Sequence, residues 1–128
     1  MRIDVCSLLV SDQQRALAFY TDVLGFTLRR AVPMGEMQWL TIASAEQPDG
    51  VELLLEPMQF EPAQVYQRAL YEAGIPAMVF TVDDVDKTYQ QLVEQGVQFS
   101  VQPTDMGPVR LAVLDDTCGN RIQLVMLR

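Results

Sequence analysis

The sequence contains no histidine and only two cysteines, Cys6 and Cys118. Without an imidazole, serine–histidine and cysteine–histidine catalytic pairs are excluded. Two cysteines are too few for a disulfide framework, so we expect a reduced, cytoplasmic protein. Cys118 lies in the turn sequence DDTCGN, where we expect its thiol to be exposed. A Walker-type phosphate loop and a dinucleotide-binding fingerprint are also missing, which removes two common nucleotide-binding classes.

Positive charge is scarce, with 9 lysines and arginines against 17 aspartates and glutamates and a formal net charge of −8. This balance argues against nucleic acid and anionic membrane surfaces as partners, because both reward clustered basic residues. No apolar run approaches the length of a membrane span. Asp4 interrupts the apolar opening and no small-residue cleavage site follows, so we expect no signal peptide.

Hydrophobic residues make up 49% of the 128 positions, which is ordinary for one folded domain spanning residues 1–128. Short apolar runs bounded by glycine, proline and aspartate predict strands. We expect them at residues 3–10, 26–32, 38–43, 51–56, 77–82, 99–102, 109–114 and 121–126.

Three helices are predicted between these strands. Ser11 and Gln14 have capping-box spacing at the start of the first helix, and Gly25 follows its end. A linker helix is expected at about residues 61–74. The third helix begins after Asp83 or Asp84, either of which can serve as the N-cap.

The order of elements repeats once along the chain. Strand, helix and three strands at about residues 1–60 are followed by the linker helix and by the same order at about residues 75–128. LGF (24–26) and QGVQF (95–99) fall at equivalent places. Two similar modules that share a core are expected. Strand-rich modules in tandem favour an α+β fold over a doubly wound parallel sheet.

Three segments carry a resemblance to a known family: VSDQQRALAFYTDVLGF (10–26), FTVDDVDKTYQQLVEQGVQF (80–99) and DDTCGNRIQLV (115–125). The sequence resembles the vicinal oxygen chelate superfamily, which includes glyoxalase I, bleomycin resistance proteins, extradiol dioxygenases and fosfomycin resistance proteins. The resemblance implies two tandem βαβββ modules that form a cupped mixed sheet around a small-molecule cavity. It also implies a homodimer.

Metal-dependent members of this superfamily place one ligand at each of four strand positions. The resemblance puts these positions on Val5, Ala77, Gln123 and Glu52, with Leu54 as the alternative in the fourth strand. Alkyl groups stand where two imidazoles would bind, and a glutamate with an amide makes a poor site for zinc or iron. We therefore expect no metal and no other cofactor.

Strand alternation extends this set to a candidate ligand pocket. Its predicted members are Val5, Ser7, Trp39, Leu54, Ala77, Val79 and Gln123, with Glu52 and Arg110 as polar contacts. An apolar face with few polar groups suits a small organic ligand, and a tryptophan ring can stack on a planar one. The alternative is that these side chains only fill a core or an interface. Glu52 and Glu56 share a strand face, which a solvated outer surface explains better than acid–base chemistry.

Three functions are consistent with these residues. The first is a metal-independent protein that sequesters an apolar or aromatic small molecule, and the acidic balance allows a cationic one. The second is an enzyme of the superfamily, a lyase, isomerase or dioxygenase with a non-standard metal site or none. The third is a structural or regulatory dimer whose cavity is filled by its own side chains, so that no ligand raises its melting temperature.

Overall fold

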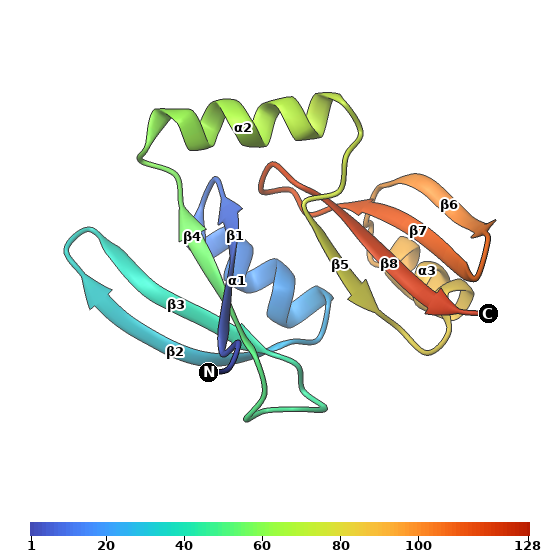
Figure 1. Cartoon of the computed structure of the whole chain (residues 1–128), viewed down its shortest axis with the longest axis horizontal. Helices are drawn as coiled ribbons and strands as arrows, with labels where there is room; N and C mark the ends of the chain where they lie inside the picture. The colour runs from blue at the N-terminus through green and yellow to red at the C-terminus, as the bar shows by residue number, and fades with distance from the viewer. The chain divides into compact units, whose positions relative to one another are not determined.

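The chain folds into two similar four-stranded sheets with helices beside them (Figure 1). A computed structural model describes all residues 1–128. One sheet belongs to the compact unit Met1–Val65 and the other to the compact unit Tyr66–Arg128. Each unit contains one strand, one helix and three further strands in that order, so the predicted α+β fold with two tandem modules is confirmed. None of the helices is both long and apolar enough to cross a membrane.

Unit 1, residues 1–65, has the strand order β1-β4-β3-β2. Its elements are β1 (Val5–Val10), α1 (Gln13–Ala18), the π-helical segment η1 (Phe19–Val23), β2 (Thr27–Met34), β3 (Met37–Ala43) and β4 (Glu52–Pro57). β1 and β4 pair in parallel, whereas β2–β3 and β3–β4 pair antiparallel. The parallel pair places the first strand of the module in the sheet beside its last one.

Unit 2, residues 66–128, repeats this arrangement with the order β5-β8-β7-β6. Its elements are β5 (Met78–Thr81), α3 (Val85–Glu94), β6 (Phe99–Met106), β7 (Val109–Asp115) and β8 (Arg121–Leu127). β5 and β8 are the parallel pair. Helix α2 (Glu61–Glu72) joins the two units, and the boundary in the sequence, between Val65 and Tyr66, falls within this helix.

In each unit the helix between the first two strands packs against one face of the sheet, and the core lies between them. Alternate strand residues point to that face, as the period of two requires. In unit 1 the buried strand residues are Leu8, Val10, Leu40, Ile42 and Leu55, and the helical residues are Ala16, Phe19 and Tyr20. In unit 2 they are Ala112, Leu114, Ile122 and Leu124, against Val85 and Leu92 of α3.

The helix starts differ in part from the sequence prediction. The N-cap of α1 is Asp12, whose carboxylate accepts a 2.9 Å hydrogen bond from the Arg15 amide, so the Ser11 capping box was wrong. Aspartate fills this role as well as serine does. In unit 2, Asp84 caps α3 by accepting from the Lys87 amide at 3.0 Å.

Several strand bounds also moved. β1 begins at Val5 rather than residue 3, and β6 runs to Met106 rather than residue 102. The extension of β6 follows from its antiparallel pairing with β7, which continues to the Met106–Val109 pair despite two irregularities in register. Pairing with a neighbour therefore overrides the weak strand propensity of the Gln-Pro-Thr-Asp segment.

The turn between β7 and β8 is buried, contrary to the expected exposure of Cys118. The Asp116 carboxylate accepts hydrogen bonds from the backbone amides of Cys118 at 2.7 Å and Asn120 at 2.9 Å. Helix α2 covers the same turn, where Gln67 Nε2 donates to the Cys118 carbonyl and to Asn120 Oδ1, both at 3.1 Å. Cys118 is consequently fully buried. The burial of Cys118 therefore follows from the contacts of the Asp116 carboxylate and the Gln67 amide with the turn. Sequence spacing does not reveal these contacts.

Gly119 is expected to be the least replaceable glycine of unit 2. It has φ +95°, and a Cβ there would come within 2.4 Å of Gln67 Oε1, whose side chain is held by buried hydrogen bonds. We expect Gly119→Ala to lower the free energy of unfolding by about 2–4 kcal/mol, from backbone strain plus loss of these bonds. The control is Gly35→Ala, with φ +68° and open space around the new Cβ, which should lose only about 1 kcal/mol. Urea denaturation measures both, and equal losses would contradict the role of Gln67.

Candidate functional site

The sheet face of unit 1 opposite α1 carries every pocket residue predicted in this unit. Parallel register places Val5 beside Glu52 and Ser7 beside Leu54. Antiparallel register adds Thr41 beside Leu54, and Trp39 beside Val32 on β2. Because cross-strand partners share a face, we call the following set the open face of unit 1: Val5, Ser7, Arg30, Val32, Met34, Trp39, Thr41, Glu52, Leu54 and Glu56.

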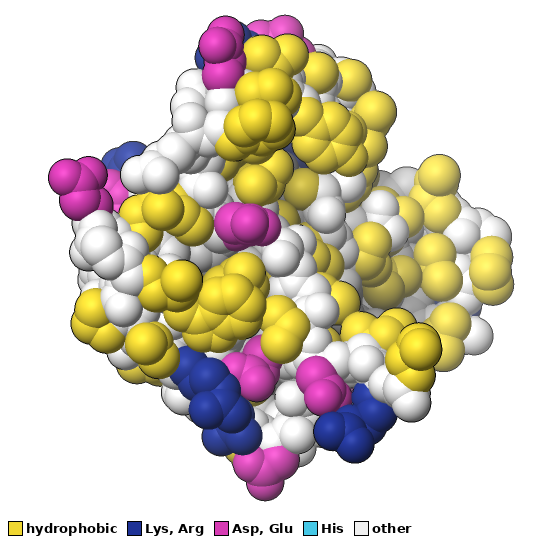
Figure 2. All heavy atoms as spheres, turned by 60° about the vertical axis from the view of Figure 1, so that its left-hand side comes forward, with side chains coloured by type: hydrophobic (Ala, Val, Ile, Leu, Met, Phe, Trp, Pro, Cys, Tyr) yellow, Lys and Arg dark blue, Asp and Glu magenta, His cyan; other side chains and the backbone are white.

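This open face is largely apolar and partly exposed. Trp39 is 37% exposed and Val32 is 51% exposed, whereas Leu54, on β4 and the same face, is 7% exposed. Figure 2 brings the β2–β3 side of the molecule forward and shows hydrophobic side chains together with acidic and basic ones. Apolar surface of this kind that stays in water is a common mark of a binding surface.

One polar cluster lies within the open face. Glu52 Oε1 accepts hydrogen bonds from the Thr41 hydroxyl at 2.7 Å and from Arg30 Nε at 3.0 Å. The Glu52 side chain is 13% exposed, so the expected solvated outer surface was wrong for this residue. The hydrogen bond from Thr41, together with the Arg30 charge, holds the pKa of Glu52 below its ordinary 4.5 against the opposing effect of burial.

Arg30 is anchored at one atom only. Its side chain is 51% exposed, and Nε donates to Glu52 while Nη1 and Nη2 donate to no group of the chain. Its neighbour Arg29 makes a separate ion pair with Asp49, 3.6 Å between Nη2 and Oδ1. Arg30 was not among the predicted site residues, because the pattern of β2 does not show which residue of β4 it meets.

Gln13 links β3 and β4 next to Trp39 through its side-chain amide. Its Nε2 donates to the carbonyls of Gln38 and Leu55, both at 2.9 Å, and its Oε1 accepts from the Gln38 amide at 3.1 Å. The side-chain amide thus takes the place of direct strand-to-strand bonds beyond the Thr41–Leu54 pair. This residue was missed by sequence reasoning. The only signal was a polar residue in the first turn of a helix that packs on a sheet.

Unit 2 brings its own three predicted pocket residues together. Val79 pairs with Gln123, and the Ala77 amide donates to the Arg121 carbonyl at 2.9 Å. All three lie on the face opposite the α3 core, where Val79 is 52% exposed. The side-chain amide of Gln123 has no partner in the chain, which leaves two donors and an acceptor for another group.

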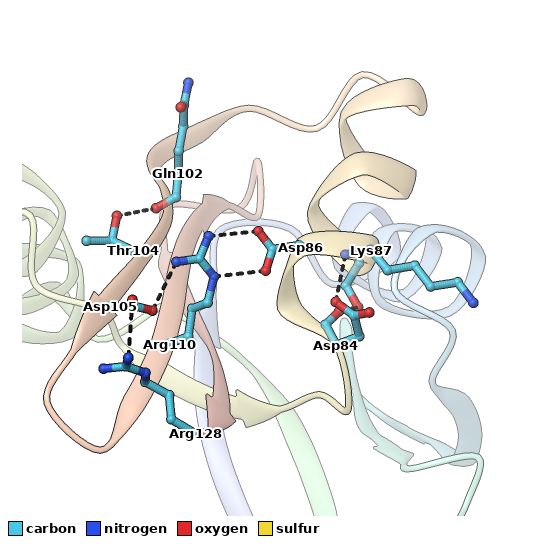
Figure 3. A network of polar contacts seen from close by, with 9 residues as sticks. Asp84, Asp86, Lys87, Gln102, Thr104, Asp105, Arg110 and Arg128 are labelled. Atoms are coloured by element: carbon cyan, nitrogen blue, oxygen red, sulfur yellow. Dashed lines mark hydrogen bonds and ion pairs between the residues drawn. The ribbon is translucent and has the colours of Figure 1, made fainter.

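Arg110 is not brought to this face. Its strand-register partner is Met126, so its side chain lies on the α3 side of the sheet. There its guanidinium donates to both carboxylate oxygens of Asp86 at 2.8 Å (Figure 3). Nη1 also donates to Asp105 at 3.0 Å. The hydrogen bonds from Arg110 hold the pKa of Asp86 below its usual range. Arg110 therefore connects α3 to the β6–β7 hairpin, because Asp86 and Asp105 accept hydrogen bonds from its guanidinium.

The residues at the four family metal positions do not fit a divalent ion. Val5 and Ala77 offer no donor atom, and Gln123 offers one neutral carbonyl oxygen. Glu52 is the single carboxylate, and Arg30 and Thr41 already use its Oε1. No group of three or more cysteine, aspartate and glutamate side chains anywhere in the chain is placed to hold a metal ion.

These features define a class of two-module α+β proteins. Each βαβββ module has a helix on one face of its sheet and the candidate site residues on the other face. A profile described as "Glyoxalase/Bleomycin resistance protein/Dioxygenase superfamily" matches residues 2–124. The chain belongs to this superfamily.

Several known proteins are similar over nearly the full length. The uncharacterized protein YurT of Bacillus subtilis (strain 168) is 50% identical over 125 residues, which cover 98% of each chain. The crystal structure of UcmS2 is 30% identical with a TM-score of 0.83, covering 98% of this chain and 97% of that one. TnmS3, an antibiotic binding protein from Streptomyces sp. CB03234, is 26% identical with a TM-score of 0.77, covering 100% and 97%.

The Glu52 cluster predicts a pH-dependent contribution to stability. A carboxyl group whose pKa is lowered on folding stabilises the protein fully above its unfolded value, here 4.5. That contribution is lost as the pH falls through the lower folded pKa. We expect Glu52→Gln to destabilise the protein at pH 7 by about 1 kcal/mol, and the difference from wild type to shrink below pH 4.5.

The matched control is Glu56→Gln, on the same strand and the same face, because Glu56 makes no hydrogen bond or ion pair within the chain. Urea denaturation of wild type, Glu52→Gln and Glu56→Gln gives their free energies of unfolding. A series from about pH 3 to about pH 7 covers both protonation states of a glutamate. A Glu52→Gln difference that stays constant across the series would contradict the ion pair as its source.

Proposed function

We propose that the protein binds a small apolar or aromatic molecule without a metal ion and holds it rather than transforming it. The observation that carries the proposal is the open face of unit 1, where an exposed tryptophan lies among alkyl side chains and a metal position is occupied by Val5. Burial of apolar surface and ring stacking would supply the affinity. TnmS3, which is described as an antibiotic binding protein, gives a similar precedent in the same superfamily.

The proposed contacts on the open face of unit 1 are Val5, Ser7, Trp39 and Leu54. The corresponding face of unit 2 carries its own proposed contacts, Ala77, Val79 and Gln123. Glu56 adds a carboxylate without a partner to the open face of unit 1, which allows a positive charge elsewhere on the ligand. Assembly as a homodimer and a cytoplasmic location belong to the same proposal, and analytical ultracentrifugation tests the first of these.

Metal independence is tested on untagged, purified protein. We expect elemental analysis to find far less than one metal ion per chain, because the four family positions provide one carboxylate that is already paired. Added zinc, manganese or nickel should leave the melting temperature unchanged, since an ion that does not bind the native state cannot stabilise it. About one tightly held ion per chain, with a rise in melting temperature on re-addition, would favour the enzyme alternative, a lyase, isomerase or dioxygenase.

Ligand binding is tested through Trp39. It is the only tryptophan of the chain, so its emission reports on the open face of unit 1 without any label. We expect a screen of small planar aromatic compounds to yield some that both quench this emission and raise the melting temperature. Trp39→Ala should weaken binding of those compounds by at least about tenfold, because stacking and burial are lost together.

Phe60→Ala is the matched control, since Phe60 is an aromatic residue of the same unit that is 73% exposed and lies outside the open face. It should leave the affinity unchanged in calorimetric titrations. Equal loss in both variants would show that the compounds bind exposed aromatic residues without a specific site. A screen without any stabilising compound would favour the structural dimer instead.

A further inference from the structure

Two of the four family metal positions, Val5 and Glu52, lie on the same sheet face as Arg30, whose Nη1 and Nη2 have no partner in the chain. This arrangement suggests what kind of ligand unit 1 recognises. Val5 is the register partner of Glu52, so the strand position of the family's first ligand lies directly beside the remaining carboxylate. In this chain the group that meets that carboxylate is the guanidinium of Arg30, at 3.0 Å through Nε. A fixed side-chain cation therefore stands next to Glu52.

The geometry of this anchoring leaves one edge of Arg30 available. Arg30 Nε donates to Glu52 Oε1, and the Thr41 hydroxyl donates to the same oxygen at 2.7 Å, so two donors hold the carboxylate in place. Nη1 and Nη2 carry four N–H donors in a plane and donate to nothing in the chain. A guanidinium fixed at one atom loses less entropy when it binds an oxygen acceptor than a free arginine does.

Trp39 is the diagonal cross-strand neighbour of Arg30 on the same sheet face. Val32 is the register partner of Trp39, and Arg30 is the partner of the next residue on that face, Thr41. Diagonal neighbours on one face of an antiparallel pair are about 7–8 Å apart at Cα, a distance that aromatic and long side chains span. A ring stacked on Trp39 can thus direct a substituent toward Arg30.

We propose that Arg30, anchored by Glu52, takes over the ligand-orienting role of a metal ion and donates hydrogen bonds to a carboxylate or ketone oxygen on a planar aromatic ligand stacked on Trp39. This inference rests on the proposed binding function and specifies its ligand class. The step is recognition only, because nothing in the cluster transfers a proton or forms a bond to the ligand. Arg30 would determine specificity, and Glu52 would position it.

Three probes with one ring system test the inference: 2-naphthoate, 2-methylnaphthalene and 2-naphthylmethylammonium. Quenching of Trp39 emission gives each dissociation constant at one salt concentration. We expect wild-type protein to bind 2-naphthoate roughly tenfold more tightly than 2-methylnaphthalene, which is the size of effect that charge-assisted hydrogen bonds give. Arg30→Gln should remove this preference and leave binding of 2-methylnaphthalene unchanged.

Arg29→Gln is the matched control, because it removes the same charge from the adjacent residue, whose partner is Asp49. It should keep the preference for 2-naphthoate, which separates local hydrogen bonding from the overall field. Arg30→Lys keeps the charge but not the planar pair of donors, and it should lose most of the preference. If Arg30→Gln melts at a lower temperature than wild type, the binding constants of Arg30→Lys decide the test instead.

The outcomes separate this inference from the proposed function. Equal binding of all three probes, or tightest binding of the cationic one, overturns the role of Arg30 while the binding function stands. Retention of the full preference in Arg30→Gln or in Arg30→Lys overturns it as well. If no probe quenches Trp39 emission at all, the aromatic-binding function and the inference fail together.

Discussion

A four-stranded sheet has two faces, and in each unit of this protein a single helix of the βαβββ module packs on only one of them. The alternation of side chains along a strand then decides everything else about the site. Residues such as Leu8 and Leu55 form the core with α1, and their direct neighbours Ser7 and Leu54 are directed to the other face. The module builds its stable core and its candidate site from the same strands.

Parallel pairing of the first strand with the last strand of a module gives that second face its chemical character. It brings Val5 next to Glu52 in unit 1 and Val79 next to Gln123 in unit 2, although about 45 residues separate the partners in each case. In metal-dependent members of the superfamily such pairs would unite ligands. Here the same pairing unites an alkyl group with one polar side chain, so each pair offers a single side chain with donor atoms.

Much of the fold was predictable because its signals are local. The SDQQRALAFY and VDDVDKTYQQL segments carry caps and apolar periodicity within a dozen residues, and the repeat of the element order needs no long-range information. Arg30, Gln13 and the buried Cys118 were missed for the opposite reason. Their partners, Glu52, Leu55 and Gln67, lie 22, 42 and 51 residues away. Only strand register and helix docking decide those contacts, and a single sequence leaves register open.

The strand register also explains how Glu52 is accommodated on this face of a chain that has no imidazole. A carboxylate that is mostly shielded from water and has no cation beside it would be costly, and its pKa would rise. Glu52 escapes this cost because Arg30 and Thr41 reach it from β2 and β3, and its pKa is lowered instead. The Glu52 carboxylate is thus stabilised by side chains of the protein itself. A guanidinium differs from an ion in being directional, and here Nε is used by Glu52 while Nη1 and Nη2 have no partner in the chain.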